Sequence, residues 1–267
     1  MGESFIHSRQ EGPIFYITLA RADKRNALTI DMMEDIAAAA LKADELADVR
    51  AILLTAEGPI FSAGIDIMAL AGFSQVADGL SAARLLRRGA GRLQECLNVL
   101  EATELPVIGV LQGQVIGLGL ELALACDLRV GASDLKMSIP ESRMGLVADV
   151  GGTTRLCRAV GPSRAKDLLM TARSLEADEA LQWGLLNRVA PLDELMATAE
   201  KLAADIARNA PLAVGAAKLL VDQGDGLDRH TQMALERWAQ SQLITSGDCQ
   251  EAFMAFMEKR PPSFKAR

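Results

Sequence analysis

Aromatic residues and histidines are scarce in this sequence of 267 residues. Phenylalanine, tryptophan and tyrosine together make up 4% of the chain, which leaves few flat side chains on which nucleic acid bases could stack. The two histidines, His7 and His230, are far in the sequence from other ligand types, so they indicate neither a metal site nor a Ser-His-Asp triad. We therefore expect no metal ligands and no chemistry based on histidine.

The four cysteines are widely spaced and include no Cys-x-x-Cys pair. This spacing favours reduced thiols and a cytoplasmic location. No apolar run approaches the roughly 20 residues that a membrane-spanning helix needs. The first residues also lack the basic start and apolar middle of a secretory signal. We expect a cytoplasmic protein with no membrane partner.

Positive charge is in short supply, because the net charge is −7 and the isoelectric point is near 5. No basic stripe offsets this acidity, so we expect no nucleic acid partner. Any anionic ligand must then be met by local basic groups. Half of the residues are hydrophobic and about a quarter are charged. This is the balance of an ordinary globular protein, long enough to bury a sizeable core.

The first part of the chain alternates strand and helix patterns, and the second part is helical. Apolar runs predict buried strands over 13–19, 49–55 and 106–111. Thr29 can cap a helix that runs to about Asp44. Amphipathic patterns predict further helices over 82–103, 150–160, 163–171, 176–183, 192–208, 211–222, 227–245 and 249–259. We predict an α/β core over 1–190 that carries the active site. A helical C-terminal region over 191–267 is expected to form the oligomer.

The segment from Gly113 to Asp127 carries the strongest chemical signal. It opens with glycines after an apolar run and continues as a helix with a carboxylate, Glu121, in its first turn. Such a turn aims backbone N–H groups and the positive end of a helix at one point beside a potential acid or base. A second carboxylate, Glu141, follows another short strand 20 residues later. Together these features predict a site that polarises a carbonyl oxygen and moves protons beside it.

Three motifs taken together resemble the enoyl-CoA hydratase/isomerase family, also called the crotonase family. They are Phe61-Ser62-Ala63-Gly64-Ile65-Asp66, the segment 113–127, and Pro140-Glu141 followed by Gly151-Gly152-Thr153-Thr154-Arg155-Leu156. The resemblance covers nearly the whole chain. It implies an α/β fold, a crotonase-like spiral of ββα units, that forms a homo-oligomer, either a trimer or a dimer of trimers. It also implies acyl-CoA thioester substrates and no metal or redox cofactor, because coenzyme A arrives as part of the substrate.

By this resemblance, the backbone N–H groups of Ile65 and Leu118 form an oxyanion hole. Negative charge develops on the thioester oxygen during the reaction, and each preorganised donor can lower the barrier by roughly 3 kcal/mol. Leu118 stands where the family usually has glycine. A backbone donor tolerates this change, but the leucine side chain needs room and can reshape the acyl pocket.

Glu121 and Glu141 match the two glutamates with which hydratases of this family hold the attacking water. The resemblance implies that Glu121 acts chiefly on the water and that Glu141 delivers a proton to the α-carbon. Two carboxylates in one small site do not both ionise easily, so one is expected to hold a proton near neutral pH. A simpler interpretation makes them a helix-start acid and a solvated loop acid. We predict the addition of water to trans-2-enoyl-CoA, which gives 3-hydroxyacyl-CoA.

Asp149 leaves a second reaction open. It stands where hydratases of the family often have glycine. The pattern 145–151 resembles that of dienoyl-CoA isomerases, in which an aspartate here shuttles a proton with the glutamate at 141. Those isomerases tend to carry aspartate in place of Glu121. Asp149 can instead cap a helix that begins at Val150. A 3,5-2,4-dienoyl-CoA isomerase is therefore the alternative, and a non-catalytic acyl-CoA-binding homologue is a third interpretation.

The resemblance also assigns six residues to CoA and substrate binding: Lys24, Arg25, Ala63, Ile67, Phe256 and Lys259. The two early cations match positions near the nucleotide of CoA, and Ala63 and Ile67 flank the path of the adenine and the pantetheine. The late cation matches a basic residue that can reach the ligand of a neighbouring subunit. Each cation can equally be a solvated surface charge.

Overall fold

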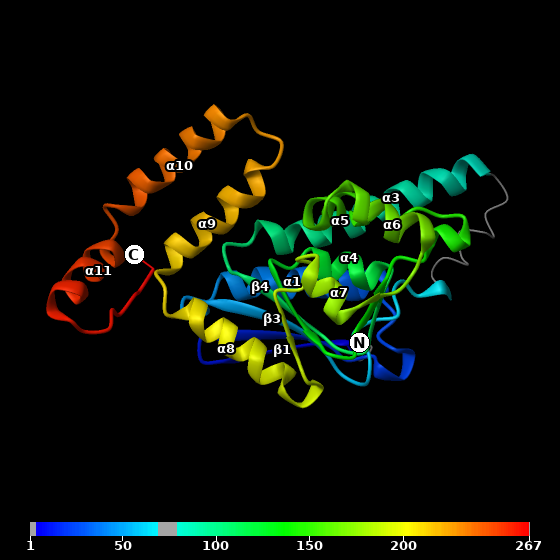
Figure 1. The fold of residues 1–267 in the computed structure, drawn as a ribbon, viewed down its shortest axis with the longest axis horizontal. Coiled ribbons are helices and arrows are strands. Elements are labelled where there is room, and N and C mark those ends of the chain that lie inside the picture. Colours follow the sequence, from blue (N-terminus) through cyan, green and yellow to red (C-terminus); the bar gives the residue numbers. More distant parts are fainter. Residues whose placement is uncertain (1–3, 69–78, 267) are drawn as a thin grey trace.

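A computed structural model describes residues 4–68 and 79–266 of the chain (Figure 1). Its centre is a six-stranded sheet with the spatial order β1 (Ile6–Glu11), β2 (Ile14–Leu19), β3 (Ala51–Ala56), β4 (Val107–Leu111), β6 (Leu128–Ala132) and β9 (Arg188–Ala190). Neighbouring strands are parallel except for β1, which pairs antiparallel with β2. The predicted strands over 13–19, 49–55 and 106–111 are confirmed as β2, β3 and β4.

The sequence analysis does not predict β1 or β6, and their composition explains why. Five of the six residues of β1 are exposed, because it is an edge strand that lacks a buried apolar run. The short strand β6 is interrupted by Arg129 and Gly131, a charged residue and a residue of low strand propensity. Both strands are held by pairing with a partner strand and not by a pattern of their own.

A second, three-stranded sheet consists of β5 (Gln114–Ile116), β7 (Lys136–Ser138) and β8 (Leu175–Glu176). β4 in the large sheet leads to β5 in the small sheet and then to α4 (Leu118–Leu124). In the same way β6 leads to β7, then to the short 3₁₀ helix η2 (Glu141–Met144) and α5 (Gly152–Val160). These successive ββα units confirm the predicted spiral.

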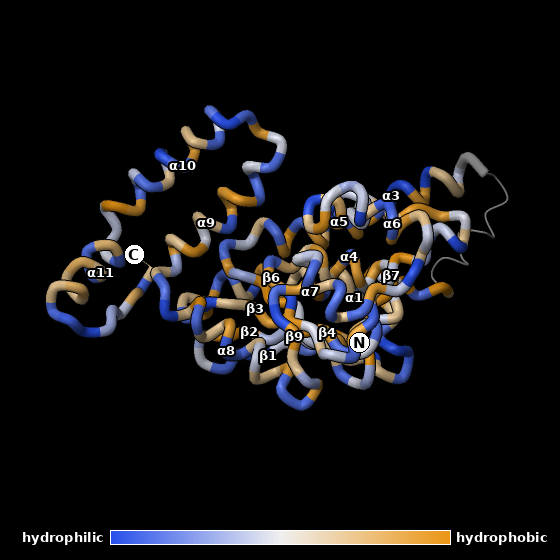
Figure 2. Tube along the Cα trace, in the orientation of Figure 1, coloured by the Kyte–Doolittle hydropathy of each residue, from blue (hydrophilic) through white to orange (hydrophobic). Residues whose placement is uncertain are grey.

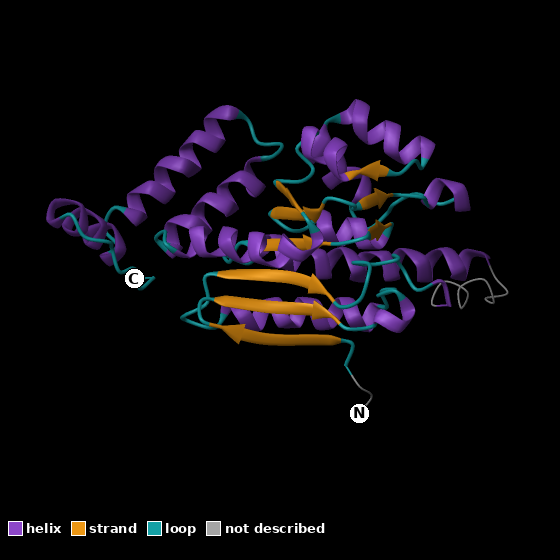
Figure 3. Cartoon of the chain, turned by 60° about the horizontal axis from the view of Figure 1, so that its bottom comes forward, coloured by secondary structure: helices purple, strands orange, loops and turns teal. Residues whose placement is uncertain are grey.

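The two faces of the large sheet pack against different helices (Figure 3). Side chains alternate along a strand, so Ile52 and Leu54 belong to one core while Leu53 belongs to the other. The larger core includes α1 (Ile30–Asp44) and α3 (Gly79–Ala102), and the smaller core lies under α8 (Leu195–Ala207). Both faces are covered, which is why the parallel strands read as continuous apolar runs in the sequence.

The predicted helices are confirmed within a few residues at their ends. Thr29 caps α1, because its side-chain oxygen accepts a hydrogen bond from the backbone N–H of Met32 at 3.2 Å. The remaining elements are η1 (Ala22–Lys24), α6 (Pro162–Thr171), α7 (Ala177–Gln182), η3 (Leu192–Glu194), α9 (Pro211–Gly224), α10 (Arg229–Leu243) and α11 (Gly247–Glu258). The sequence also predicts a helical region after Asp66, which lies largely outside the described residues.

The helices α9, α10 and α11 form a C-terminal arm that extends away from the sheets (Figure 1). The predicted C-terminal region, 191–267, also includes α8, which packs on the large sheet through Leu195, Ala199 and Ala203. Polar and apolar segments alternate along α9 and α10 (Figure 2). Of the helices in the described part of the chain, none is both long enough and apolar enough to cross a membrane.

One buried lysine fastens the arm to the core. The ammonium group of Lys218 in α9 lies 3.0 Å from a carboxylate oxygen of Asp127, just after α4. It also donates hydrogen bonds to the backbone oxygens of Leu100 and Leu105, at 2.8 and 3.0 Å. Asp127 in turn accepts a hydrogen bond from the N–H of Val107 at 2.6 Å. These contacts join the arm, the end of α3 and the segment that follows α4.

Candidate active site

Two loops meet at the N-terminus of α4. The backbone N–H of Ile116 donates to the oxygen of Ser62 at 3.0 Å, which joins the loop before Gly64 to β5. A Cβ atom on Gly64 would lie 2.7 Å from the oxygen of Ile116 and 3.6 Å from the nitrogen of Leu118. Gly64 also has a φ of +91°, so glycine is required there for two reasons. This close approach brings the backbones of Ile65 and Leu118 to one place.

The N–H groups of Ile65 and Leu118 differ from two nearby N–H groups, because they have no acceptor among the described residues. Leu28 N–H donates to the oxygen of Gly64, and Asp66 N–H donates to the oxygen of Leu28, both at 2.8 Å. Within residues 4–68 and 79–266, neither the N–H of Ile65 nor that of Leu118 donates to an acceptor of the chain. Two donors from different loops therefore stand side by side, the arrangement that an oxyanion hole requires.

Glu121 lies in the first turn of α4 and is 2% exposed. One of its carboxylate oxygens, Oε1, accepts hydrogen bonds from the N–H groups of Val150 and Gly152, at 2.9 and 2.8 Å. A Cβ atom on Gly152 would lie 2.7 Å from that oxygen, so a larger residue would displace the carboxylate. Burial raises the pKa of Glu121 to about 7, and the charges of Glu141 and Asp149 add to the effect, while the two N–H groups oppose it.

Glu141 is the first residue of η2 and lies against the turn that precedes α4. A Cβ atom on Gly117 would lie 2.5 Å from its Oε1 atom. Its Oε2 atom is buried and has no hydrogen-bond partner among the described residues. Burial raises the pKa of Glu141, and the charge of Asp149 raises it further. Gly117 is the N-cap of the helix that carries Glu121, and the charge of Glu141 raises the pKa of Glu121, so the two carboxyl groups lie at the same end of α4.

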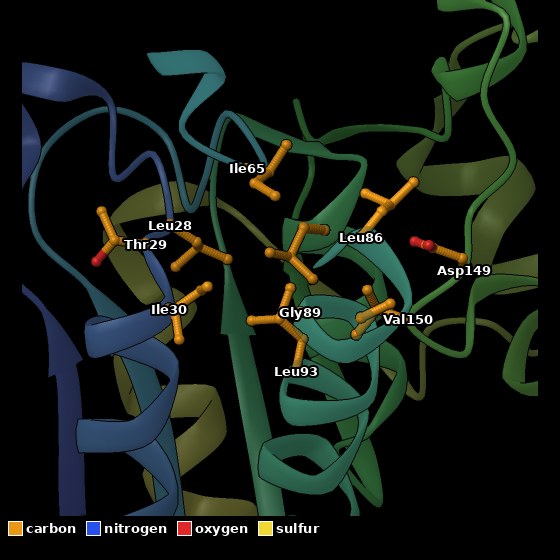
Figure 4. Close-up of a pocket in the computed structure, with 11 residues that line it drawn as sticks. Leu28, Thr29, Ile30, Ile65, Leu86, Gly89, Leu93, Asp149 and Val150 are labelled. Atoms are coloured by element: carbon orange, nitrogen blue, oxygen red, sulfur yellow. The ribbon is translucent and has the colours of Figure 1, made fainter. Parts of the chain in front are cut away.

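An apolar cavity of about 120 Å³ opens between the N-terminal end of α1, α3 and the start of α4 (Figure 4). Its lining includes both predicted oxyanion residues and several aliphatic side chains: Leu28, Ile65, Leu86, Leu93, Leu118 and Val150. Among the described residues that line it, Asp149 is the one carboxylate. Figure 4 shows this carboxylate on the side of the cavity that Leu86 and Val150 form. The shape and polarity suit an acyl chain with a single acidic group beside it.

Asp149 does not cap a helix, which corrects one interpretation of the sequence. The helix α5 begins at Gly152, two residues later than the capping interpretation requires, and its N-cap residue is Gly151. Asp149 is exposed, and its backbone oxygen accepts a hydrogen bond from the side-chain amide of Gln94 at 2.5 Å. Gly151, with a φ of +95°, allows a tight turn here, and this turn delays the start of the helix.

The four early binding candidates lie beside the loop of Ile65. Lys24 and Arg25 are exposed at the end of η1, and the N–H of Ala63 donates to the oxygen of Arg25 at 2.9 Å. Ile67 follows two residues after Ile65 and is 63% exposed. The structure therefore places two cations and two apolar residues at one edge of the candidate site.

The two late candidates lie elsewhere. Phe256 is 85% exposed near the end of α11, and Lys259 is exposed directly after it. In Figure 1, α11 is at the opposite end of the molecule from the N-terminal part of α3, which lines the cavity. A single chain does not bring these two residues to the site.

The sequence analysis misses the groups that hold Glu121 in place. These are the N–H groups of Val150 and Gly152, which no side-chain pattern reveals. The adjacent glycines at 151 and 152 are the only signal in the sequence that could have found them. In the described part of the chain, no cluster of three or more His, Cys, Asp or Glu residues could hold a metal ion.

The fold has counterparts among solved structures. An enoyl-CoA hydratase from Bacillus anthracis matches with a TM-score of 0.91 at 31% identity, over 98% of this chain and 100% of that chain. An enoyl-CoA hydratase subunit from Geobacillus kaustophilus matches with a TM-score of 0.89 at 35% identity, over 98% of each chain. The protein therefore has the crotonase fold.

Sequence comparison identifies the family. The model of the enoyl-CoA hydratase/isomerase family matches residues 9–267. A short-chain-enoyl-CoA hydratase from Clostridium acetobutylicum is 34% identical over 94% of each chain. The mitochondrial methylglutaconyl-CoA hydratase of Mus musculus is 36% identical over 94% of this chain and 79% of its own length. The chain belongs to the enoyl-CoA hydratase/isomerase family, as its motifs predict.

Proposed function

We propose that this protein is an enoyl-CoA hydratase, which adds water to trans-2-enoyl-CoA thioesters and gives 3-hydroxyacyl-CoA. The observation that carries the proposal is a pair of carboxyl groups beside the N–H groups of Ile65 and Leu118: Glu121 in the first turn of α4, and Glu141 against Gly117 at the N-cap of that helix, close enough for its charge to raise the pKa of Glu121. Family membership supports an acyl-CoA thioester as the substrate. The apolar cavity offers room for the acyl chain.

In the proposed reaction, the thioester oxygen accepts hydrogen bonds from Ile65 and Leu118. As water attacks the β-carbon, this oxygen gains negative charge, which the two fixed donors stabilise. Glu121 takes a proton from the attacking water, so that the hydroxyl group bonds to the β-carbon. Glu141 gives its proton to the α-carbon, and the net change is the addition of one water molecule. The proton on Glu121 then returns through solvent, which restores both carboxyl groups.

The pKa shifts support a proton shared by the two glutamates. Burial raises the pKa of both glutamates, and the ionisation of one opposes that of the other. The pair is therefore expected to share one proton near neutral pH. The two N–H groups of Val150 and Gly152 favour the ionised form of Glu121, the form that can accept a proton.

A second candidate function is a 3,5-2,4-dienoyl-CoA isomerase that uses Glu141 and Asp149. The observation that favours it is the position of Asp149 in the wall of the apolar cavity. An acid on each side of an extended diene can remove a proton from one carbon and return a proton to another. Glu121 has no direct part in that reaction.

The rest of the proposal concerns CoA and assembly. Lys24 and Arg25 would contact the phosphates of CoA, with Ala63 and Ile67 along its path. Phe256 and Lys259 would complete the site of a neighbouring copy in a trimer or a dimer of trimers. We propose a cytoplasmic enzyme without a metal or redox cofactor, which binds coenzyme A only as part of its substrate.

The first experiment compares crotonyl-CoA with a 3,5-dienoyl-CoA as substrates of the purified protein. Loss of the enoyl absorbance together with formation of 3-hydroxyacyl-CoA supports the hydratase. Conversion of the 3,5-diene alone, to its conjugated 2,4 form, overturns the hydratase in favour of the isomerase. Tight binding of CoA thioesters without turnover of either substrate indicates a non-catalytic homologue.

A further inference from the structure

Arg155 in α5 is a buried cation whose contacts reach beyond its own helix. Its side chain is 9% exposed. The Nε and Nη2 atoms each donate a hydrogen bond of 2.7 Å to a different carboxylate oxygen of Glu101. Nη2 also donates to the side-chain oxygen of Asn98 at 2.8 Å. Both partners belong to α3, so the guanidinium group is fixed from one side in a bidentate geometry.

On its other side, the guanidinium group holds the loop that precedes α5. Its Nη1 atom donates to the backbone oxygen of Val150 at 3.1 Å. The same atom lies against Gly151, where a side chain would collide with it and where φ is +95°. Arg155 therefore contacts the two residues that come immediately before Gly152.

The loop held in this way is the one that binds the carboxylate of Glu121. Val150 gives its oxygen to Arg155 and its N–H to Glu121. Gly152 gives its N–H to the same carboxylate oxygen. A continuous chain of hydrogen bonds thus leads from Glu101 through Arg155 and the 150–152 loop to Glu121.

We propose that Arg155 is a positioning residue that holds the 150–152 loop so that both N–H groups point at the Glu121 carboxylate. This inference rests on the proposed function, in which Glu121 accepts the proton of the attacking water. The charge of Arg155 is paired with Glu101, whereas the acidic groups that act on Glu121 are Glu141 and Asp149. Arg155 therefore acts through the geometry of the loop and not through its own charge.

The test is Arg155→Lys, which keeps the positive charge and removes the planar bidentate contact. A lysine cannot hold Glu101 and Val150 in one fixed plane, so the loop shifts and the two N–H groups leave the carboxylate. We expect kcat for crotonyl-CoA to fall about 100-fold, with little change in KM, since misplaced groups of this kind carry such a cost. The limb of the pH profile that reports Glu121 should move to higher pH, because the N–H groups stabilise its ionised form.

Two further variants frame this test. Glu101→Gln keeps the shape of the partner and weakens its hold on Arg155, so we expect a smaller change in the same direction. Arg173→Lys is the matched control, because Arg173 also makes a bidentate pair, with Glu179 at 2.8 Å for both bonds, on the surface of α7. The control should stay within a factor of about two of the wild-type kcat.

Two measurements on the protein alone separate this inference from the proposed function. One is the pH titration of the Glu121 carboxyl carbon by ¹³C NMR, assigned with Glu121→Gln. The other is hydrogen exchange of the Val150 and Gly152 amides, which should become faster in Arg155→Lys. Both remain informative if the wild-type protein shows no hydratase turnover, an outcome that would sink only the proposed function.

The inference is overturned if Arg155→Lys folds with the wild-type titration of Glu121 and the wild-type exchange rates at Val150 and Gly152. Unchanged kcat with an unchanged pH profile has the same meaning when the wild-type protein is active. If Arg155→Lys fails to fold, Glu101→Gln carries the same measurements, and unchanged values in that folded variant overturn the inference.

Discussion

The turn around α4 and the C-terminal arm differ in whether their side chains have partners within the chain. Around α4, Glu121 is paired with two N–H groups and Arg155 with Glu101, all within the chain. Along the arm, large apolar side chains are exposed, among them Trp238 at 67% and Phe256 at 85%. The Glu121 carboxylate is therefore held by contacts inside one copy, whereas the arm carries exposed apolar surface of the kind that often marks an interface.

The arm also differs from α8, the helix that precedes it, in the burial of its apolar residues. α8 buries Leu195, Ala199 and Ala203 against the large sheet. α10 has no buried residue, although it carries apolar residues at helical spacing. We assign its exposed apolar side chains to a neighbouring copy in the proposed oligomer, because apolar surface is costly to leave in water.

The largest effect is expected from removing the carboxylate of Glu121 in the turn around α4. Glu121→Gln should lower hydration of crotonyl-CoA by about 1,000-fold, since a positioned acid or base contributes this order of rate. The substitution keeps the size of the side chain, so the fold should persist. Steady-state kinetics and a circular dichroism spectrum check both expectations.

Glu176→Gln is the control for this variant. Glu176 is an exposed carboxylate that pairs with Lys136 at 3.5 Å, away from the turn around α4. Its loss should leave kcat unchanged. A Glu121→Gln variant that keeps wild-type hydration would remove Glu121 from the proposed mechanism. Retained diene isomerisation in that variant would favour Glu141 and Asp149.

Lys218→Met breaks the contact that joins the two regions. The variant leaves Asp127 without its cation in a mostly buried position, and the loss of one partner of such a pair costs about 3 kcal/mol of unfolding free energy. Burial already raises the pKa of Asp127, so the cost should be smaller at pH 5 than at pH 7. Urea unfolding at both pH values measures it. Lys136→Met, at an exposed ion pair, should change stability by less than about 1 kcal/mol.

The pH dependence of stability tests whether Glu121 is held in a dry environment. Its pKa is raised from 4.5 to about 7, so the folded protein binds this proton more tightly than the unfolded chain. The stabilisation is complete below pH 4.5 and is lost as the pH rises to 7, a change of about 3 kcal/mol. Glu121→Gln should lack this component. Parallel curves for the wild type and the variant would contradict a raised pKa.

A smaller effect comes from crowding the turn between the two glutamates. Gly117→Ala places a Cβ atom against Glu141 at a φ of +52°, and we expect kcat to fall about 100-fold. Gly12→Ala is the matched control, because Gly12 has a φ of +56° and nothing lies within 4 Å of its Cβ position. Backbone strain lowers the stability of both variants, but the control should keep its kcat. Equal kcat values for the two variants would show that backbone strain, and not the contact with Glu141, determines the activity.

The smallest effect is expected on the arm. Phe256→Ser removes one exposed apolar side chain, so a folded single copy should lose almost none of its stability. If Phe256 contacts a neighbouring copy, the protein concentration at half dissociation should rise. The loss of association free energy should be up to about 2 kcal/mol. Sedimentation velocity over a dilution series measures this shift. An unchanged oligomer would place the contact elsewhere on the arm.

Local patterns were enough for much of the fold and for the chemical type of the site. The strands β2 to β4 are apolar because both faces of the sheet are covered, and Thr29 carries its capping function in its own side chain. β1 and β6 have no such local signature, because they depend on pairing with β2 and β4. The motifs around Gly64, Glu121 and Glu141 identify the family, but they do not show which of the two glutamates holds a proton.

The family, the order of most elements and the candidate acids depend on residue types at short spacing, so the sequence was enough to find them. The burial of Glu121, the position of Asp149 at an apolar cavity and the contact of Arg155 with the 150–152 loop became visible only in the folded chain. The fold also places α11, which carries Phe256, at the end of the arm away from the sheets. The reason is physical: pKa values and hydrogen-bond geometry depend on groups such as Glu101, Glu121 and Val150, which are distant in sequence and meet only when the chain folds.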